Sequence, residues 1–228
     1  MITQTCLRAT CLAVASLFVL GGSVASAEIF TSTITSGNSA LAGSPGPYGT
    51  VTVNLTSPTM ATITFAANTG FLFGDSGAAD VNINATSFTE TIGTLAGPFT
   101  TPTCKSTGCF SSGNVDAQGS FNLTTELFDG YTNAANSITF TVNNTSGTFA
   151  SAADVLAANA SGLDAAAHIF VCSDPTCSTT AGGAIATGFA GELGSTGSVP
   201  EPGSIVFLCT TLLGAGVLVR RKIQSRQS

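Results

Sequence analysis

The stretch GTVTVNLTS, residues 49–57, sets an apolar side chain at every second position, with Val and Leu separated by Thr and Asn. The run ATITFAAN at 61–68 repeats this pattern with Ile63 and Phe65. Successive side chains of a β-strand point to opposite faces, so a period of two buries one face of the strand and leaves the other in water. Both runs therefore predict half-buried antiparallel strands.

The same alternation recurs further along the chain, in ADVNINAT (79–86), GSFNLTTEL (119–127) and NSITFTVNN (136–144). His168–Cys172 is typical of a buried strand, and Gly188–Gly191 of a last short one. Short strands at this spacing predict a mainly β domain, an antiparallel β-sandwich of jelly-roll or immunoglobulin-like type. The alternative is a disordered Ser/Thr-rich stalk, which the repeated pattern and fifteen Phe disfavour.

One segment departs from the strand pattern. Ser151 and Asp154 have the spacing of a helix capping box with Asp in the Glu position, and the Ala-rich segment after them predicts one short helix that ends near Gly162. We expect residues 28–191 to form a single β-rich extracellular domain, followed by a flexible Gly/Ser/Thr linker at 192–198.

The charged residues are unevenly distributed. Residues 28–198 contain eleven acidic residues and one basic residue, Lys105, which leaves a net charge of −10. Nucleic-acid binding depends on Lys and Arg that neutralise phosphates, so this composition excludes it as a function. Anionic lipid headgroups are equally poor partners for this part of the chain.

The first 27 residues have the order of a secretory signal peptide. Arg8 precedes an apolar run at 12–20, which is too short to span a bilayer, and small residues then lead to an A-x-A pattern at Ala25 and Ala27. The pattern predicts cleavage by signal peptidase before Glu28. A buried core helix is the alternative interpretation of the apolar run.

The C-terminal end combines a Pro-Glu-Pro motif, an apolar segment and a basic tail. These parts comprise Val199, Pro200, Glu201 and Pro202, then residues 205–219, then a tail at 220–226 that contains Arg220, Arg221 and Lys222. As a helix the apolar segment is about 23 Å long, short for a hydrocarbon core of about 30 Å. The basic residues are a stop-transfer signal that keeps the tail cytoplasmic. An ordinary single-pass anchor is the alternative.

This ending resembles the PEP-CTERM sorting signal of Gram-negative bacteria, with all parts in order from Val199 to Arg226. In that family an exosortase, a membrane transpeptidase-like cysteine protease, recognises the signal, and the proteins are associated with exopolysaccharide. The resemblance implies a protein that is anchored transiently in the inner membrane and then reaches the cell surface or the extracellular space. Its processing partners would be signal peptidase and exosortase, with exopolysaccharide as a further candidate partner.

Four cysteines lie outside the ends that would be removed, at Cys104, Cys109, Cys172 and Cys177. Each pair brackets a turn-rich tetrapeptide, and an exported protein meets an oxidising compartment, so we expect two local disulfides. Pairing between the two loops and a four-thiolate zinc site are the alternatives.

Candidate catalytic residues are few. The single histidine, His168, has apolar neighbours typical of a structural residue, although a Ser/His/Asp triad could use it. A glycosidase pair could come from among Asp75, Asp80, Asp116 and Glu126, but no spacing predicts that they converge. A sugar-binding platform is disfavoured because Trp is absent and Tyr is scarce.

The segment GDSGAAD (74–80) could bind calcium through Asp75 and Asp80, although it lacks the regular loop spacing and a solvated turn is the simpler interpretation.

Two functions remain for the chain as a whole. The first is a non-enzymatic structural or adhesive component of the polysaccharide matrix, without a cofactor. The second is a carbohydrate-active enzyme or a calcium-dependent carbohydrate-binding module. Carboxylates gathered in one cleft would favour the second, and scattered carboxylates the first.

Overall fold

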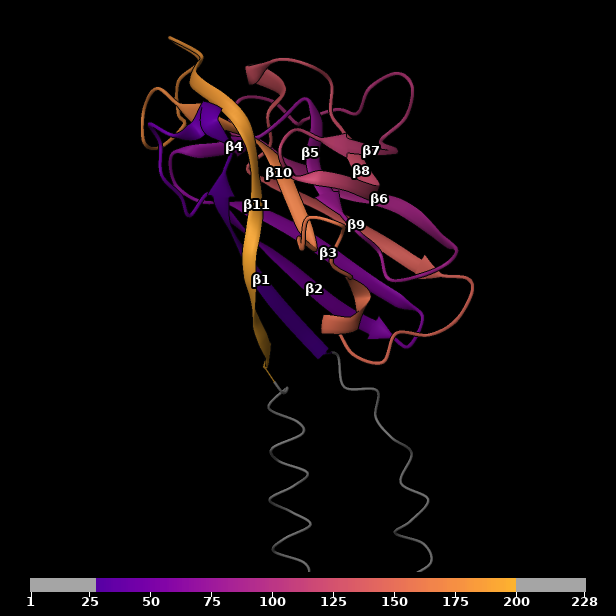
Figure 1. The fold of residues 1–228 in the computed structure, drawn as a ribbon. Helices are drawn as coiled ribbons and strands as arrows, with labels where there is room; N and C mark the ends of the chain where they lie inside the picture. Colours follow the sequence, from indigo (N-terminus) through magenta and orange to yellow (C-terminus); the bar gives the residue numbers. More distant parts are fainter. Residues whose placement is uncertain (1–27, 200–228) are drawn as a thin grey trace, which may run out of the picture.

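A computed structural model describes residues 28–199, which form an almost entirely β structure (Figure 1). Its helical content within this range is three short 3₁₀ turns, at Ser39–Leu41, Tyr131–Asn133 and Ala153–Val155. The strands are β1 (Glu28–Gly37), β2 (Gly49–Ser57), β3 (Met60–Ala67), β4 (Phe71–Phe73), β5 (Ser76–Val81), β6 (Phe88–Ala96), β7 (Phe110–Val115), β8 (Gly119–Glu126), β9 (Ser137–Asn144), β10 (Ala165–Cys172) and β11 (Ala184–Val199).

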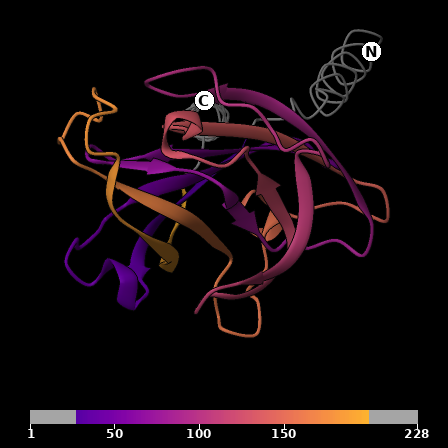
Figure 2. The same ribbon diagram turned by 90° about the horizontal axis from the view of Figure 1, so that it is seen from above.

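All eleven strands belong to one antiparallel sheet. The order is β6-β9-β3-β2-β1-β11-β10-β5-β8-β7, and β4 pairs with β10 beside this path. The sheet curls until its two halves pack face to face like a sandwich (Figure 2). Phe110 of β7 contacts Phe140 of β9 with ring centroids 5.8 Å apart, although these strands lie at or next to opposite edges of the sheet. The predicted antiparallel β structure is confirmed, and hydrogen bonding continues from one layer to the other through β1 and β11.

Strands β2 and β3 show how the two-residue period builds this core. They pair antiparallel with Val51 opposite Phe65 and Val53 opposite Ile63, and all four side chains are fully buried. The threonines between them are only partly buried, on the opposite face. Burying an aliphatic or aromatic side chain contributes about 1.5–3 kcal/mol, so the alternation determines which face turns inward.

The predicted short helix after Ser151 is wrong. Only the 3₁₀ turn Ala153–Val155 forms, and the chain is extended again at Leu156, which makes a β-bridge with Ile83. The carboxylate of Asp154 accepts a hydrogen bond from the Ala150 backbone N–H rather than completing a capping box. Val155 and Leu156 are both buried in the main core, and an extended chain brings them there.

The two ends of the described chain lie together. β11 runs beside β1, with Ile29 opposite Val199 (Figure 1), so residues 192–198, expected to be a flexible linker, are part of a paired strand. No helix within residues 28–199 is long and apolar enough to cross a membrane. The predicted cleavage residues Ala25 and Ala27 lie outside the described residues, as do Pro200, Glu201 and Pro202, the apolar segment and the basic tail.

Candidate functional site

The four cysteines form two local disulfides. Cys104 bonds to Cys109 with Cα atoms 4.8 Å apart, and Cys172 bonds to Cys177 with Cα atoms 5.3 Å apart. Both separations are normal for a disulfide. The pairing within each loop replaces the alternatives of crossed pairing and of a zinc site, because a zinc site requires thiolates.

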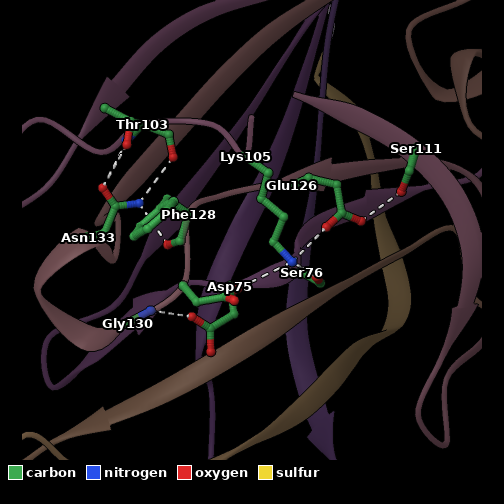
Figure 3. Close-up of polar contacts among 10 residues, drawn as sticks. Asp75, Ser76, Thr103, Lys105, Ser111, Glu126, Phe128, Gly130 and Asn133 are labelled. Atoms are coloured by element: carbon green, nitrogen blue, oxygen red, sulfur yellow. Dashed lines mark hydrogen bonds and ion pairs between the residues drawn. The ribbon is translucent and has the colours of Figure 1, made fainter. Parts of the chain in front are cut away.

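The first disulfide loop carries Lys105, the one basic residue between positions 28 and 198. Figure 3 shows its ammonium group between several acceptors: Nζ lies 3.5 Å from a carboxylate oxygen of Glu126 and 3.2 Å from one of Asp129, and it donates to the hydroxyl of Ser76. Backbone hydrogen bonds from Lys105 N–H to Glu126 C=O and from Glu126 N–H to Cys109 C=O tie the loop to the end of β8. The disulfide loop therefore holds a cation over the ends of β5 and β8.

Lys105 shares its positive charge between Glu126 and Asp129. Burial lowers the pKa of Lys105, but hydrogen bonding and charge from Asp129 and Glu126 outweigh it, so the pKa is raised above its ordinary value. The second carboxylate oxygen of Glu126 accepts a hydrogen bond of 2.7 Å from the hydroxyl of Ser111 on β7 (Figure 3). Both oxygens of Glu126 are thus engaged, and its charge is compensated.

Beside this ion pair lies a shallow hollow of about 250 Å³. Its lining comes from β5, β7 and β8 and from one residue of β11, namely Ser76, Gly77, Ser111, Ser112, Gly113, Asn114, Val115, Thr124, Glu126 and Phe189. Val115 and Phe189 pack with Ala166 and Phe121 in a small apolar cluster separate from the main core. The hollow therefore lies on the face of β5 and β8 that is turned away from the main core.

Asp80 is fully buried next to this hollow. It lies opposite Thr124 in the pairing of β5 with β8, and Thr124 lies opposite Ser111 in the pairing of β8 with β7. Burial raises the pKa of Asp80 well above its ordinary value; hydrogen bonding with the side chain of Thr124 lowers this pKa, and the charge of Glu126 raises it further. The carboxyl of Asp80 and the hydroxyl of Thr124 are therefore neighbours, and both are inaccessible to solvent. Three adjacent strands thus bring together two buried polar residues, Asp80 and Thr124, and the surface residue Ser111.

The other predicted acids do not join this site. Asp75 accepts a hydrogen bond of 2.7 Å from the backbone N–H of Gly130 (Figure 3), and Asp116 accepts one of 3.0 Å from the side chain of Asn38. The calcium candidates Asp75 and Asp80 thus contact different neighbours. Within residues 28–199, no three His, Cys, Asp or Glu side chains gather in a way that could hold a metal ion.

His168 has a mixed environment on β10. Its Nε2 lies 2.6 Å from the hydroxyl of Thr187, its ring stacks on Phe189 with centroids 4.4 Å apart, and its Nδ1 has no hydrogen-bond partner. Burial lowers the pKa of His168, against smaller opposing effects of the charge of Asp75 and of hydrogen bonding with the backbone of Ser76 and Gly74. A triad would need a carboxylate at Nδ1, so the geometry is that of a packed structural histidine.

A second carboxyl pair lies between β10 and β11. Asp164 and the buried Glu192 interact directly, and burial raises the pKa of each. The hydroxyl of Ser32, also fully buried, lowers the pKa of Glu192. Neither Asp164 nor Glu192 lines either of two hollows, of about 250 and 330 Å³, in the described part of the chain.

Sequence reasoning missed most of the hollow. Ser111 and Thr124 lie on the consecutive strands β7 and β8, Phe189 lies much further along the chain on β11, and no sequence motif links the three. Lys105 did carry a signal, because a single cation among eleven acids in residues 28–198 is expected to be held by several of them. Comparison of the chain with protein families, curated proteins and solved structures found no match in any of the three.

Proposed function

We propose that this chain is an exported protein, cleaved by signal peptidase and sorted by an exosortase, that acts as a non-enzymatic structural or adhesive component of a surface polysaccharide matrix. The observation that carries the proposal is the pair of local disulfides in a β domain, because such bonds persist outside the reducing cytoplasm. An antiparallel sandwich of jelly-roll or immunoglobulin-like type, and a membrane helix at 205–219, belong to the same proposal.

The position of the chain ends supports two cuts close to the domain. Glu28, where signal peptidase would cut, begins β1, and Val199, the first residue of the sorting motif, ends β11. Because Ile29 lies opposite Val199, both ends leave the domain at the same place (Figure 1). This arrangement suits a domain held by two membrane segments until both are removed.

The second candidate, a carbohydrate-active enzyme or calcium-dependent module, is favoured by one observation: Asp80 and Glu126 interact beside a single hollow. A retaining or inverting glycosidase needs two carboxyl groups that reach the substrate. Asp80 is fully buried, and both oxygens of Glu126 are engaged by Lys105 and Ser111. The site thus supports recognition of a ligand better than its hydrolysis.

The test is intact-mass spectrometry of the protein recovered outside its host cells, with and without reduction before alkylation. We expect a species that begins at Glu28, ends between Val199 and Pro202, and gains alkyl groups only after reduction. A cell-bound species that retains residues 203–228 would instead indicate a plain membrane anchor. Alkylation without reduction would contradict the disulfides and the oxidising route.

A further inference from the structure

The outward face of β1, β2, β3 and β9 carries threonines in register. Thr52 of β2 lies opposite Thr31 of β1 on one side and Thr64 of β3 on the other. Thr64 in turn lies opposite Thr139 of β9, which completes a threonine row across four strands. One step along the strands, a second row consists of Asn54, Thr62, Thr141 and Thr91, from β2, β3, β9 and β6. The sheet therefore presents rows of polar side chains that cross its strands.

The hydroxyls of the threonine row are accessible and already aligned. Thr31 Oγ1 lies 3.4 Å from Thr52 Oγ1, and Thr64 Oγ1 lies 3.1 Å from Thr139 Oγ1. A hydroxyl has one donor site and two acceptor sites, so one such bond leaves Thr64 and Thr139 able to bind a further partner. These side chains are only partly buried, so that partner can reach them from solvent.

The spacing of the row suits a chain of sugar rings. Adjacent strands lie about 4.8 Å apart, which is close to the length that one pyranose ring adds to an extended polysaccharide. A polysaccharide laid across the strands would thus place a ring over each strand in turn. Its hydroxyl groups would meet Thr52, Thr64 and Thr139 in succession.

The twist of the sheet favours a flexible ligand. Adjacent strands of a sheet are rotated by about 20–25° relative to one another, and this sheet curls until its two halves face each other (Figure 2). A single hydrated chain can turn along its length to follow the row. A flat crystal face would contact only part of it.

The charges of the domain favour a neutral ligand. Both rows consist of Thr and Asn, and Glu90 of β6 lies opposite the buried Val142, which places it on the other face of the sheet. Residues 28–198 contain eleven acidic residues and one basic residue, so an anionic polysaccharide would be repelled. A cationic one would find no carboxylate among the row residues. An uncharged polysaccharide avoids both difficulties.

We propose that the threonine row and the row beside it bind a single neutral polysaccharide chain that crosses β1, β2, β3 and β9. The inference rests on the proposed function, because it names the matrix component that the domain would hold. Such binding needs no Trp or Tyr, since its contacts are hydrogen bonds shared among several strands. A few exposed hydrogen bonds give weak binding, with a dissociation constant on the order of 1 mM for a hexasaccharide.

The experiment is an NMR titration of the full ¹⁵N-labelled chain in a detergent without a sugar headgroup. The probes are the neutral hexasaccharides cellohexaose and maltohexaose, with glucose as the length control and hexagalacturonate as the charge control. We expect at least one neutral hexasaccharide to shift the amide signals of Thr52, Thr64 and Thr139. Glucose should bind at least about tenfold more weakly, because one ring spans too few strands. Hexagalacturonate should also bind more weakly.

Two double variants test the row itself. Thr52→Val with Thr64→Val removes two hydroxyls and should weaken hexasaccharide binding about tenfold, while Thr52→Ser with Thr64→Ser keeps them and should leave it within about threefold. Val is favoured in strands, so the first variant is expected to fold. The matched control is Thr107→Val with Thr132→Val, at two exposed threonines outside these strands, which should leave binding within about twofold.

Several results would overturn the proposal. They are the absence of shifts with both neutral hexasaccharides, hexagalacturonate binding as tightly as the better of them, and equal losses in the row and control variants. Binding to microcrystalline cellulose without binding to cellohexaose would also overturn it, because it would indicate a flat surface as the ligand.

Failure of the ligand can be separated from failure of the broader function. If the secreted species is cut at both ends but no hexasaccharide binds, only the ligand is wrong. If a hexasaccharide binds at Thr52 and Thr64 while residues 203–228 are retained, only the sorting step is wrong.

Discussion

The two disulfide loops have the same C-x₄-C spacing but opposite surroundings. In the first, Cys104 and Cys109 are only partly buried, and Lys105 reaches out of the loop to Glu126, Asp129 and Ser76. In the second, both cysteines are buried against Leu72, Ala134 and Phe170. The first loop therefore organises a neighbouring surface, while the second completes a small core.

The second loop satisfies its own polar groups. The carboxylate of Asp174 accepts hydrogen bonds from the backbone N–H groups of Thr176, Ser178 and Thr179 and from two hydroxyls in the same segment. A hollow of about 330 Å³ also borders this loop, but none of the described residues that line it carries an unpaired buried polar side chain. The second disulfide loop is therefore self-contained, whereas the first, with the same C-x₄-C spacing, contacts the candidate site.

The largest expected effect is the loss of the buried disulfide. Replacing Cys172 and Cys177 together by Ser should lower the free energy of unfolding by about 3–5 kcal/mol: about 2 kcal/mol for the small closed ring, and the rest for hydroxyl groups buried in an apolar cluster. Urea denaturation followed by circular dichroism measures this change. A loss below about 1 kcal/mol would show that the cluster does not depend on the bond.

The matching change in the first loop should cost less stability and affect the hollow more. Replacing Cys104 and Cys109 by Ser should lower the free energy of unfolding by about 2 kcal/mol, because the new hydroxyls can reach water. The freed loop would no longer hold Lys105, so NMR signals of Ser76 and Glu126 should shift. If the second double variant shifted these signals equally, the contrast between the loops would fail.

The difference between the loops also shows what sequence alone could predict. The period-two runs predicted β2, β3 and β9, and the cysteine spacing together with the predicted export route predicted both disulfides. Neither could predict what each loop contacts, because Lys105 meets Glu126 and Ser76 only after β5 has paired with β8. The same long-range pairing places Asp80 opposite Thr124. β6 was missed because its exposed, edge-strand sequence lacks a clear alternation.

An intermediate effect is expected for Asp80, the buried acid beside the first loop. Its pKa is raised in the folded state, chiefly by burial, so the folded protein holds this proton more tightly than the unfolded chain. Stability from this group is present below the unfolded pKa of about 4 and is lost as the pH rises through the folded pKa. Asp80→Asn should remove that loss and raise the free energy of unfolding near pH 7 by about 1 kcal/mol.

Urea denaturation between pH 4 and pH 8 checks this prediction. The variant should show a flatter dependence of stability on pH than the original chain, with the two curves closest at the acidic end. Asp116→Asn, the same change at an exposed aspartate in the β7–β8 turn, is the control for replacing a carboxyl by an amide at the surface. If Asp80→Asn lost more stability between pH 4 and pH 8 than the original chain does, the sign assigned to Asp80 would be contradicted.

The smallest effect is expected in the self-contained loop. The hydrogen bonds that Asp174 accepts from Thr176, Ser178 and Thr179 lower its pKa to about 2, so its contribution has the opposite sign from that of Asp80. Stability from Asp174 is present above the unfolded pKa of about 4 and is lost as the pH falls through about 2. Asp174→Asn should therefore lower Tm slightly near pH 7, and the difference from the original chain should shrink toward pH 2. A difference in Tm that grew on acidification would mean that the ionised carboxylate does not organise this loop.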